Sequence, residues 1–133
     1  MQNKNKLLIG ENETIKKAII KIKKNGTRTV VVVNNKNSLL GTLTEGDIQK
    51  ALLKNVKINS NIKSLYNKSP KKINLNNINL DTISKIFIKG QYGALPVVDS
   101  KNIVQKVITW PQIFNSKKVK LKLKKIDVVI MAG

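Results

Sequence analysis

The chain has 133 residues, enough for one compact domain or two small repeats that share a core, but too few for two independent full-sized domains. It contains no cysteine and no histidine, which excludes disulfides, thiolate chemistry, the usual zinc ligands and histidine acid/base catalysis. Its net charge of +19 favours a polyanionic partner, yet only one of the 26 basic residues is Arg, which makes bidentate contacts to phosphate and guanine. We therefore interpret most of the charge as a solvated lysine-rich surface, and nucleic acid is not the expected partner.

We expect no targeting signal at the amino terminus. Residues 7–9 form a short apolar run, well below the length of a signal-peptide core, and no later run approaches the length of a membrane span. We expect a cytoplasmic chain without membrane contact. Residues 7–9 are instead predicted to form a short leading strand.

The first long element is an amphipathic helix. Its apolar residues recur at the helical spacing i, i+3, i+4 and i+7 with lysines between them: Ile15, Ala18, Ile19 and Ile22. Asn25 and Gly26 follow as a left-handed cap. The pattern predicts a helix that buries one face and ends near residue 25.

A hairpin and a second helix follow. Residues 30–33 are four consecutive valines, typical of a strand buried on both faces. Residues 34–37 have the composition of a turn, and residues 39–43 are predicted to form the next strand. A helix is then expected over about residues 45–53, with three buried side chains: Ile48, Ala51 and Leu52.

The second half of the chain repeats the first at a constant offset. This offset places Val32 on Val97 and Thr44 on Thr109. The repeated elements are a strand at 72–75, a helix at 80–88, a strand at 94–98, a turn at 99–102, a strand at 103–108 and a short helix from Pro111. One half-buried hairpin of this size is marginally stable in water. We therefore expect an α/β fold in which two β-α-β-β-α units pack against each other.

The pattern changes after residue 114. Residues 119–123 alternate between apolar and basic side chains, which predicts an edge strand or an exposed connector. Residues 126–133 form an apolar run that ends in a glycine, as a buried strand would. We expect the fold to continue beyond this run.

Several of these features resemble the CBS domain family. They are the duplication, the helix that leads into the valine strand, and residues 41–48, which read Gly-Thr-Leu-Thr-Glu-Gly-Asp-Ile. Copies of this domain end in a glycine, a threonine two or three residues later, and an aspartate three residues after that threonine. Residues 62–70 are similar to the lead-in of a second copy, and residues 94–99 are similar to its central strand.

The resemblance implies two CBS repeats packed with pseudo-twofold symmetry. The repeats would occupy residues 1–56 and 57–115, and residues 116–133 would form a connector and the first strand of another domain. The family also implies nucleotide clefts between the two sheets and a homodimer that forms through the helices. AMP, ATP or a guanine nucleotide is the implied ligand.

The resemblance places a nucleotide site in the first copy. In the family the threonine hydroxyl contacts a phosphate and the aspartate contacts the ribose hydroxyls, roles that fall here to Thr44 and Asp47. A carboxylate can accept two hydroxyl donors, and a helix N-terminus offers free N–H groups to a phosphate. Gly26, Thr27 and Arg28 lie where family members often contact the base or the phosphate.

The same residues also allow a purely structural interpretation. Thr44 and Asp47 lie where a strand ends and a helix begins, so they can form a capping box. In the second copy Thr109 and Gln112 keep the capping pattern but lack the carboxylate. Helix capping therefore explains both copies, whereas ribose binding explains only the first, and Thr109 marks the weaker second site.

Other candidate residues do not define a reaction. Trp110 and Tyr92 are candidates for stacking on a base, but an aromatic residue near a helix start more often packs against the core. In the second repeat Lys106 stands at the position that Gly41 occupies in the first. The seven acidic residues offer no spaced carboxylate pair for acid/base catalysis or metal binding. We assign no catalytic residue, metal or cofactor, and the chain is not expected to be an enzyme.

Residues 127–133, Asp-Val-Val-Ile-Met-Ala-Gly, resemble the opening strand of sugar-nucleotide nucleotidyltransferases, which enters a glycine-rich loop around an NTP phosphate chain. Nucleotidyltransferases with a leading CBS pair are known in the biosynthesis of legionaminic-type sugars. The resemblance implies that the chain is the regulatory front of such a guanylyltransferase, with residues 117–126 as the connector to its C-terminal transferase domain. An ordinary last strand is the alternative.

Three functions therefore follow from the sequence. The first is a regulatory module that senses a nucleotide, which requires different ligand affinities in two states of the protein. The second is a purely structural module that dimerises the parent enzyme and binds no ligand. The third is a lysine-rich nucleic-acid-binding domain.

Overall fold

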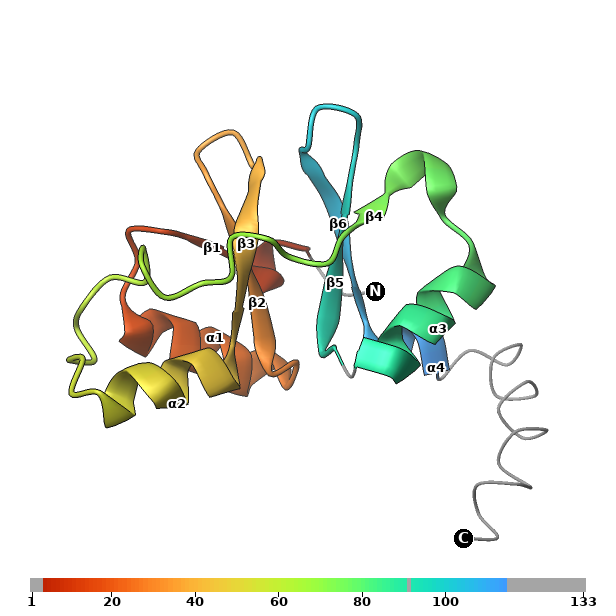
Figure 1. The fold of residues 1–133 in the computed structure, drawn as a ribbon. Helices are drawn as coiled ribbons and strands as arrows, with labels where there is room; N and C mark the ends of the chain where they lie inside the picture. The colour runs from red at the N-terminus through yellow and green to blue at the C-terminus, as the bar shows by residue number, and fades with distance from the viewer. Residues whose placement is uncertain (1–3, 91, 115–133) are drawn as a thin grey trace, which may run out of the picture.

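The computed structural model describes residues 4–90 and 92–114, which form two three-stranded sheets flanked by helices (Figure 1). The first half contains the 3-10 helix η1 (Lys4–Leu7), β1 (Leu8–Gly10), α1 (Ile15–Asn25), β2 (Thr29–Val33), β3 (Leu39–Thr44) and α2 (Glu45–Leu53). The second half contains β4 (Ile73–Asn74), the 3-10 helix η2 (Leu75–Asn77), α3 (Leu80–Gly90), β5 (Ala94–Val98), β6 (Val104–Thr109) and α4 (Trp110–Phe114). The predicted α/β fold with two β-α-β-β-α repeats is confirmed.

The two sheets have the same topology. In each, the first strand runs parallel to the central strand, and the central strand pairs antiparallel with the third. Thr29 pairs with Thr44 in the first sheet, and their counterparts Ala94 and Thr109 pair with each other in the second. The repeat predicted from the sequence is therefore preserved in the hydrogen-bond register.

The central strand β2 is buried on both faces, as its valines predict. Val30 and Val32 belong to the core beneath α1 and α2, whereas Val31 and Val33 belong to a core that the two sheets share. The residues of β5 divide between two cores in the same way. The molecule is therefore layered as helices, sheet, sheet and helices (Figure 1), and the two repeats depend on one common core.

Backbone hydrogen bonds join the hairpin tips of the two repeats. The Leu39 N–H donates to the Asn102 carbonyl (2.9 Å), and the Val104 N–H donates to the Asn37 carbonyl (2.9 Å). Asn37 and Asn102 have φ values of 63° and 66°, in the left-handed region that asparagine tolerates. These contacts tie the repeats together at one end of their strands.

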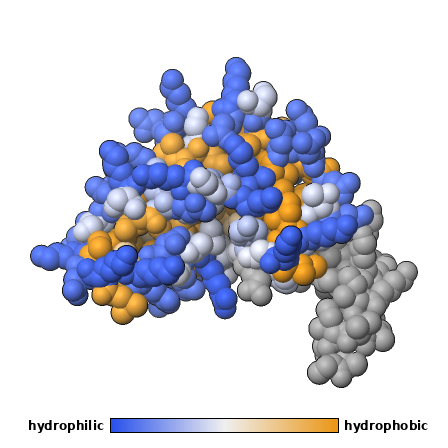
Figure 2. All heavy atoms as spheres, viewed as in Figure 1, coloured by the Kyte–Doolittle hydropathy of each residue, from blue (hydrophilic) through white to orange (hydrophobic). Residues whose placement is uncertain are grey.

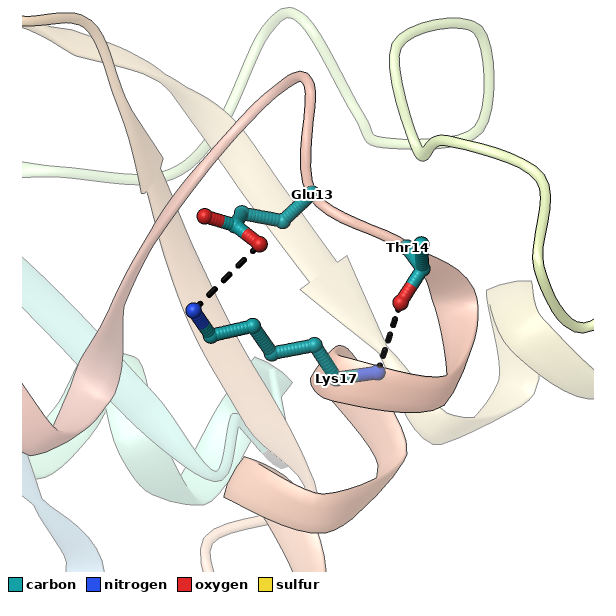
Figure 3. A network of polar contacts seen from close by, with 3 residues as sticks. All are labelled: Glu13, Thr14 and Lys17. Carbon is teal, nitrogen blue, oxygen red and sulfur yellow. Dashed lines mark hydrogen bonds and ion pairs between the residues drawn. The ribbon is translucent and has the colours of Figure 1, made fainter.

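The helix α1 is capped at both ends, and the sequence predicted the cap at Gly26. At its start the Thr14 hydroxyl accepts a hydrogen bond from the Lys17 N–H (3.1 Å), and the Lys17 ammonium pairs with Glu13 at 3.3 Å (Figure 3). That ion pair is half exposed and contributes little. At the other end Gly26 has a φ of 63°, and its N–H donates to the Ile22 carbonyl (2.8 Å). The cap fixes where the next loop begins.

The linker between the repeats, residues 54–72, crosses the first repeat before it reaches the second (Figure 1). Asn67 exchanges two backbone hydrogen bonds with Thr42 of β3, at 3.1 and 2.8 Å. Gly41 permits this approach, because a Cβ at that position would overlap the Asn67 carbonyl oxygen and the Tyr66 ring. The linker is thus fastened to β3.

One predicted core residue is wrong. Leu52 was expected to be buried with Ile48 and Ala51, but its side chain is 39% exposed. The helix α2 contacts β3 and α1 through the face that carries Ile48 and Ala51. Since α1 covers the rest of this face of the sheet, Leu52 lies at the rim.

A short helix, α4, ends the described part of the chain. The last described helix begins at Trp110, one residue before the predicted start at Pro111, because proline is accepted in the first turn of a helix. The strand expected over residues 119–123 and the apolar run of residues 126–133 lie outside the described residues.

None of the helices in the described ranges has the length and apolar character that a membrane crossing requires.

Candidate functional site

A cleft of about 1570 Å³ lies between the two repeats. Its walls come from the loop between α1 and β2, the junction of β3 and α2, the linker, and the corresponding loop and junction of the second repeat. All six site residues proposed from the sequence line this one cleft: Gly26, Thr27, Arg28, Thr44, Asp47 and Thr109. The structure thus joins the two candidate sites into one continuous space.

The junction of β3 and α2 forms a capping box. The Thr44 hydroxyl accepts from the Asp47 N–H (3.1 Å), and the Asp47 carboxylate oxygen Oδ2 accepts from the Thr44 N–H (3.0 Å). The predicted capping role is therefore confirmed. Capping uses one carboxylate oxygen, and within the described residues the other, Oδ1, has no recorded partner. Because Asp47 is only partly buried, Oδ1 can still accept hydroxyl donors.

The first amides of α2 differ in their partners. The Glu45 N–H donates to the Arg28 carbonyl (2.9 Å), and the Asp47 N–H donates to the Thr44 hydroxyl. No acceptor within the described residues is recorded for the Gly46 N–H, and Gly46 lines the cleft. An unused amide at a helix N-terminus suits an anion.

The loop between α1 and β2 presents different groups to the cleft. The Thr27 side chain is buried, and its hydroxyl donates to the Thr29 carbonyl (2.8 Å), so it holds the loop in place. Arg28 is exposed and has a φ of 60°, a left-handed conformation that is unfavourable for a side chain of this size. Arg28 thus occupies a strained position at the edge of the cleft, where such strain is often tied to function.

The second repeat has a similar cap with different chemistry. The Thr109 N–H donates to the Gln112 side-chain oxygen (2.9 Å), as predicted, and Thr109 itself is buried. An amide oxygen replaces the carboxylate, so this half of the cleft carries no anionic acceptor at the position of Asp47. The two halves are therefore chemically unequal.

Two features of the cleft were not predicted from the sequence. Lys71, in the linker, adds a second basic side chain to the cleft beside Arg28. No periodic pattern marks the linker, and its similarity to the lead-in of a second repeat was the one signal in the sequence. The other feature is the role of Gly41, which makes room for the linker. Neither Gly41 nor Lys106, which stands in the equivalent place, lines the cleft.

The linker is also held by a buried tyrosine. The Tyr66 hydroxyl donates to the Glu11 carboxylate (3.0 Å), and its ring packs in the core of the first repeat. Burial raises the pKa of Tyr66 above its usual value of 10.0, and the hydrogen bond and negative charge of Glu11 raise it further. The adjoining Asn67 lines the cleft, so this anchor positions one of its walls.

Two α/β repeats thus enclose one cleft. Residues 2–54 match the family model of the CBS domain. The described chain has the fold of solved CBS domain structures, and the two findings together support a CBS domain pair.

Three similar proteins illustrate the relationship. An uncharacterized protein from Helicobacter pylori is 29% identical over 114 residues, which cover 85% of this chain and 34% of that protein. A homoserine O-acetyltransferase from Methanococcus vannielii is 36% identical over 121 residues, 87% of this chain and 24% of that protein. A CBS domain protein from Pyrobaculum aerophilum, solved in complex with AMP, has a TM-score of 0.73 at 15% identity and covers 90% of this chain and 91% of its own. The chain thus spans about a third or less of the curated relatives it matches.

Proposed function

We propose that this chain is a regulatory module that binds an adenine or guanine nucleotide in the cleft between its repeats. The observation that carries the proposal is the convergence of Thr44, Asp47 and Arg28 on one cleft of about 1570 Å³. Arg28 and Lys71 are its basic side chains, and Glu45 and Asp47 its acidic ones. Such a mixture suits a ligand that carries both an anionic phosphate and hydroxyl donors.

Each end of a nucleotide has a matching group in the first repeat. The Asp47 oxygen Oδ1 would accept the ribose hydroxyls, while Oδ2 continues to cap the helix. The Gly46 amide and the positive end of the α2 dipole would face the phosphate. The Arg28 guanidinium would pair with the phosphate in a bidentate, charge-assisted contact. The AMP complex of the Pyrobaculum aerophilum protein supports AMP as the first ligand to test.

Thermal unfolding with AMP, ADP, ATP, GDP and GTP tests the proposal. A ligand that binds only the folded state stabilises it by about 2.7 kcal/mol at a hundred times its Kd. We expect one of these nucleotides to raise the unfolding midpoint, and Asp47→Ala to remove the shift. Asp47→Gln is the matched variant, because Gln112 shows that a glutamine caps the equivalent helix.

The two variants separate capping from binding. Asp47→Gln should keep the unliganded stability of the native chain but lose the nucleotide shift, since it lacks the second carboxylate oxygen. If the nucleotide still raises the unfolding midpoint of Asp47→Gln, the Asp47 carboxylate does not contact the ligand. No shift with any nucleotide in the native chain would refute the proposed function.

The parent enzyme is a further part of the proposal. We propose that residues 1–56 and 57–115 are the two repeats and that residues 116–133 lead into a sugar-nucleotide nucleotidyltransferase of the legionaminic type. The resemblance of residues 127–133 to the opening strand of that fold supports this assignment. The Methanococcus vannielii relative makes an acetyltransferase the competing parent. An assay of the full-length protein for guanylyl transfer to a sugar phosphate and for acetyl transfer to homoserine decides between them.

A second candidate function is dimerisation without a ligand. Large apolar side chains are exposed on the helices: Leu53 on α2 is 84% exposed, Ile20 on α1 55% and Ile88 on α3 47%. In Figure 2 hydrophobic residues come to the surface in separate patches among hydrophilic ones. A second copy of this chain would bury such side chains. Light scattering should report a homodimer that Leu53→Lys dissociates, and a monomer in the native chain would exclude this function.

A further inference from the structure

We infer that the second repeat supplies a stacking surface for the base of the bound nucleotide, formed by Tyr92 and Trp110, while the first repeat holds the ribose and phosphate. The inference rests on the proposed function, because it assigns a role to the other half of the same cleft. Both side chains line the cleft, and both are large rings with substantial exposure.

Trp110 is exposed and held in one orientation. Its side chain is 42% exposed at the start of α4. The Phe87 ring lies nearly perpendicular to the indole, with centroids 6.1 Å apart and an interplanar angle of 82°. This edge-to-face arrangement is favourable and fixes the indole plane. An indole that is already fixed loses little conformational entropy when a base stacks on it.

Tyr92 is positioned by α3, the helix that also carries Phe87. Its side chain is 38% exposed, and its ring lies against the backbone of Gly90, where a Cβ would overlap the ring. Gly90 is the last residue of α3, and Phe87 lies one turn earlier. The final turn of α3 therefore holds both aromatic side chains at the cleft.

The first repeat has neither ring. At the offset that places Thr44 on Thr109, Tyr92 corresponds to Thr27 and Trp110 corresponds to Glu45. Thr27 is buried with its hydroxyl bound to the loop, and Glu45 is an exposed anion. Conversely, the Asp47 carboxylate has no counterpart in the second repeat. Each repeat thus carries the groups that the other lacks, which favours one ligand across both repeats over two equivalent ligands.

Trp110 is the only tryptophan of the chain, so its fluorescence reports directly on the stacking surface. We would titrate the whole chain with AMP, GMP, CMP and ribose 5-phosphate, exciting at the red edge of indole absorption, where nucleotides are transparent. We expect AMP or GMP to quench the indole emission. CMP should bind more weakly because its single ring stacks over less area. Ribose 5-phosphate should bind at least about tenfold more weakly, without quenching.

Calorimetric titration of four variants assigns the affinity to the rings. Trp110→Leu and Tyr92→Leu keep apolar volume but lose the π surface, and should weaken nucleotide binding by on the order of 10-fold to 100-fold. Trp110→Phe and Tyr92→Phe retain a ring and should stay within a few-fold of the native affinity. Ile88→Ala is the control, because Ile88 is an exposed apolar residue of α3 that does not line the cleft.

The outcomes separate this inference from the proposed function. If a nucleotide binds and Asp47→Ala abolishes binding, while both leucine variants keep native affinity and the indole emission does not change, the stacking surface is wrong and the proposed function stands. If no nucleotide binds, both are overturned. The unliganded unfolding midpoint identifies any variant that fails to fold. If Trp110→Leu fails to fold, Tyr92→Leu tests the stacking surface instead, because the emission of Trp110 still reports nucleotide binding in that variant.

Discussion

Gly93 lies so close to Thr27 that a Cβ at residue 93 would overlap the Thr27 carbonyl oxygen. The two residues belong to corresponding loops of the two repeats, and both loops line the cleft. The contact therefore sets how closely the repeats approach beside the cleft. It also explains why the second repeat has a glycine where the first has Arg28.

Gly93→Ala is expected to destabilise the protein by about 1–3 kcal/mol, because the added methyl group must push against a backbone carbonyl that cannot move alone. Urea unfolding measures the change. Gly10→Ala is the control, since its nearest neighbour would be the Glu13 Cγ at 3.8 Å, an ordinary contact. Equal stability of Gly93→Ala and the native chain would mean that the loops can separate freely.

Arg28→Gly is expected to make the fold more stable and the nucleotide complex weaker. Glycine adopts the φ of 60° without the penalty of about 1–2 kcal/mol that a side chain incurs in this conformation. The lost guanidinium should weaken nucleotide binding about tenfold or more. Urea unfolding and calorimetric titration measure the two effects.

Asn55→Gly is the matched control for that variant. Asn55 has a φ of 68° and does not line the cleft, so the substitution should leave nucleotide affinity unchanged. If Arg28→Gly also leaves affinity unchanged, Arg28 does not contact the ligand.

Gly41→Ala is expected to release the linker from β3, because the new methyl group would occupy the place of the Asn67 carbonyl oxygen. The loss of stability should be about 1–3 kcal/mol. Hydrogen exchange should accelerate at the Thr42 and Asn67 amides, which pair with each other's carbonyl groups in the native chain. Lys106→Ala, an exposed substitution at the equivalent position of the second repeat, should change neither the stability nor the exchange rates. Exchange in Gly41→Ala that is as slow as in the native chain would contradict the pairing of the linker with β3.

Tyr66 should titrate above the usual tyrosine pKa, because burial and Glu11 both favour its protonated form. A pKa that is higher in the folded state than in the unfolded state stabilises the fold. This contribution is complete below the unfolded pKa of about 10 and is lost as the pH rises through the folded pKa. Absorbance titration of the phenolate should show a late step. Tyr66→Phe should remove this step, and a late step that persists in Tyr66→Phe would contradict its assignment to Tyr66.

The repeat was the part of the fold that the sequence predicted best. Hydrophobic patterns that recur at a fixed offset must form the same elements, and α1 and α3 indeed correspond residue for residue at the offset that places Thr44 on Thr109. The cap at Thr44 was predictable for a similar reason, since capping depends on residues that are close together in the chain.

Features that depend on distant parts of the chain could not be predicted. Leu52 satisfies the local helical pattern, but α1 already occupies the space that would have buried it. The place of Lys71 in the cleft depends on the path of a linker that has no periodic pattern. The orientation of Trp110 depends on Phe87, which belongs to a different helix, so the sequence could not separate packing from stacking.

The close approach of Gly93 to Thr27 also determines which repeats can be partners. Two first repeats from different chains, packed in the same way, would place Arg28 of one where Gly93 lies now, against Thr27 of the other. The larger residue would not fit there, so this homotypic pairing is disfavoured relative to the heterotypic pairing within one chain. The absence of a side chain at residue 93 therefore favours the pairing of the two different halves of one chain.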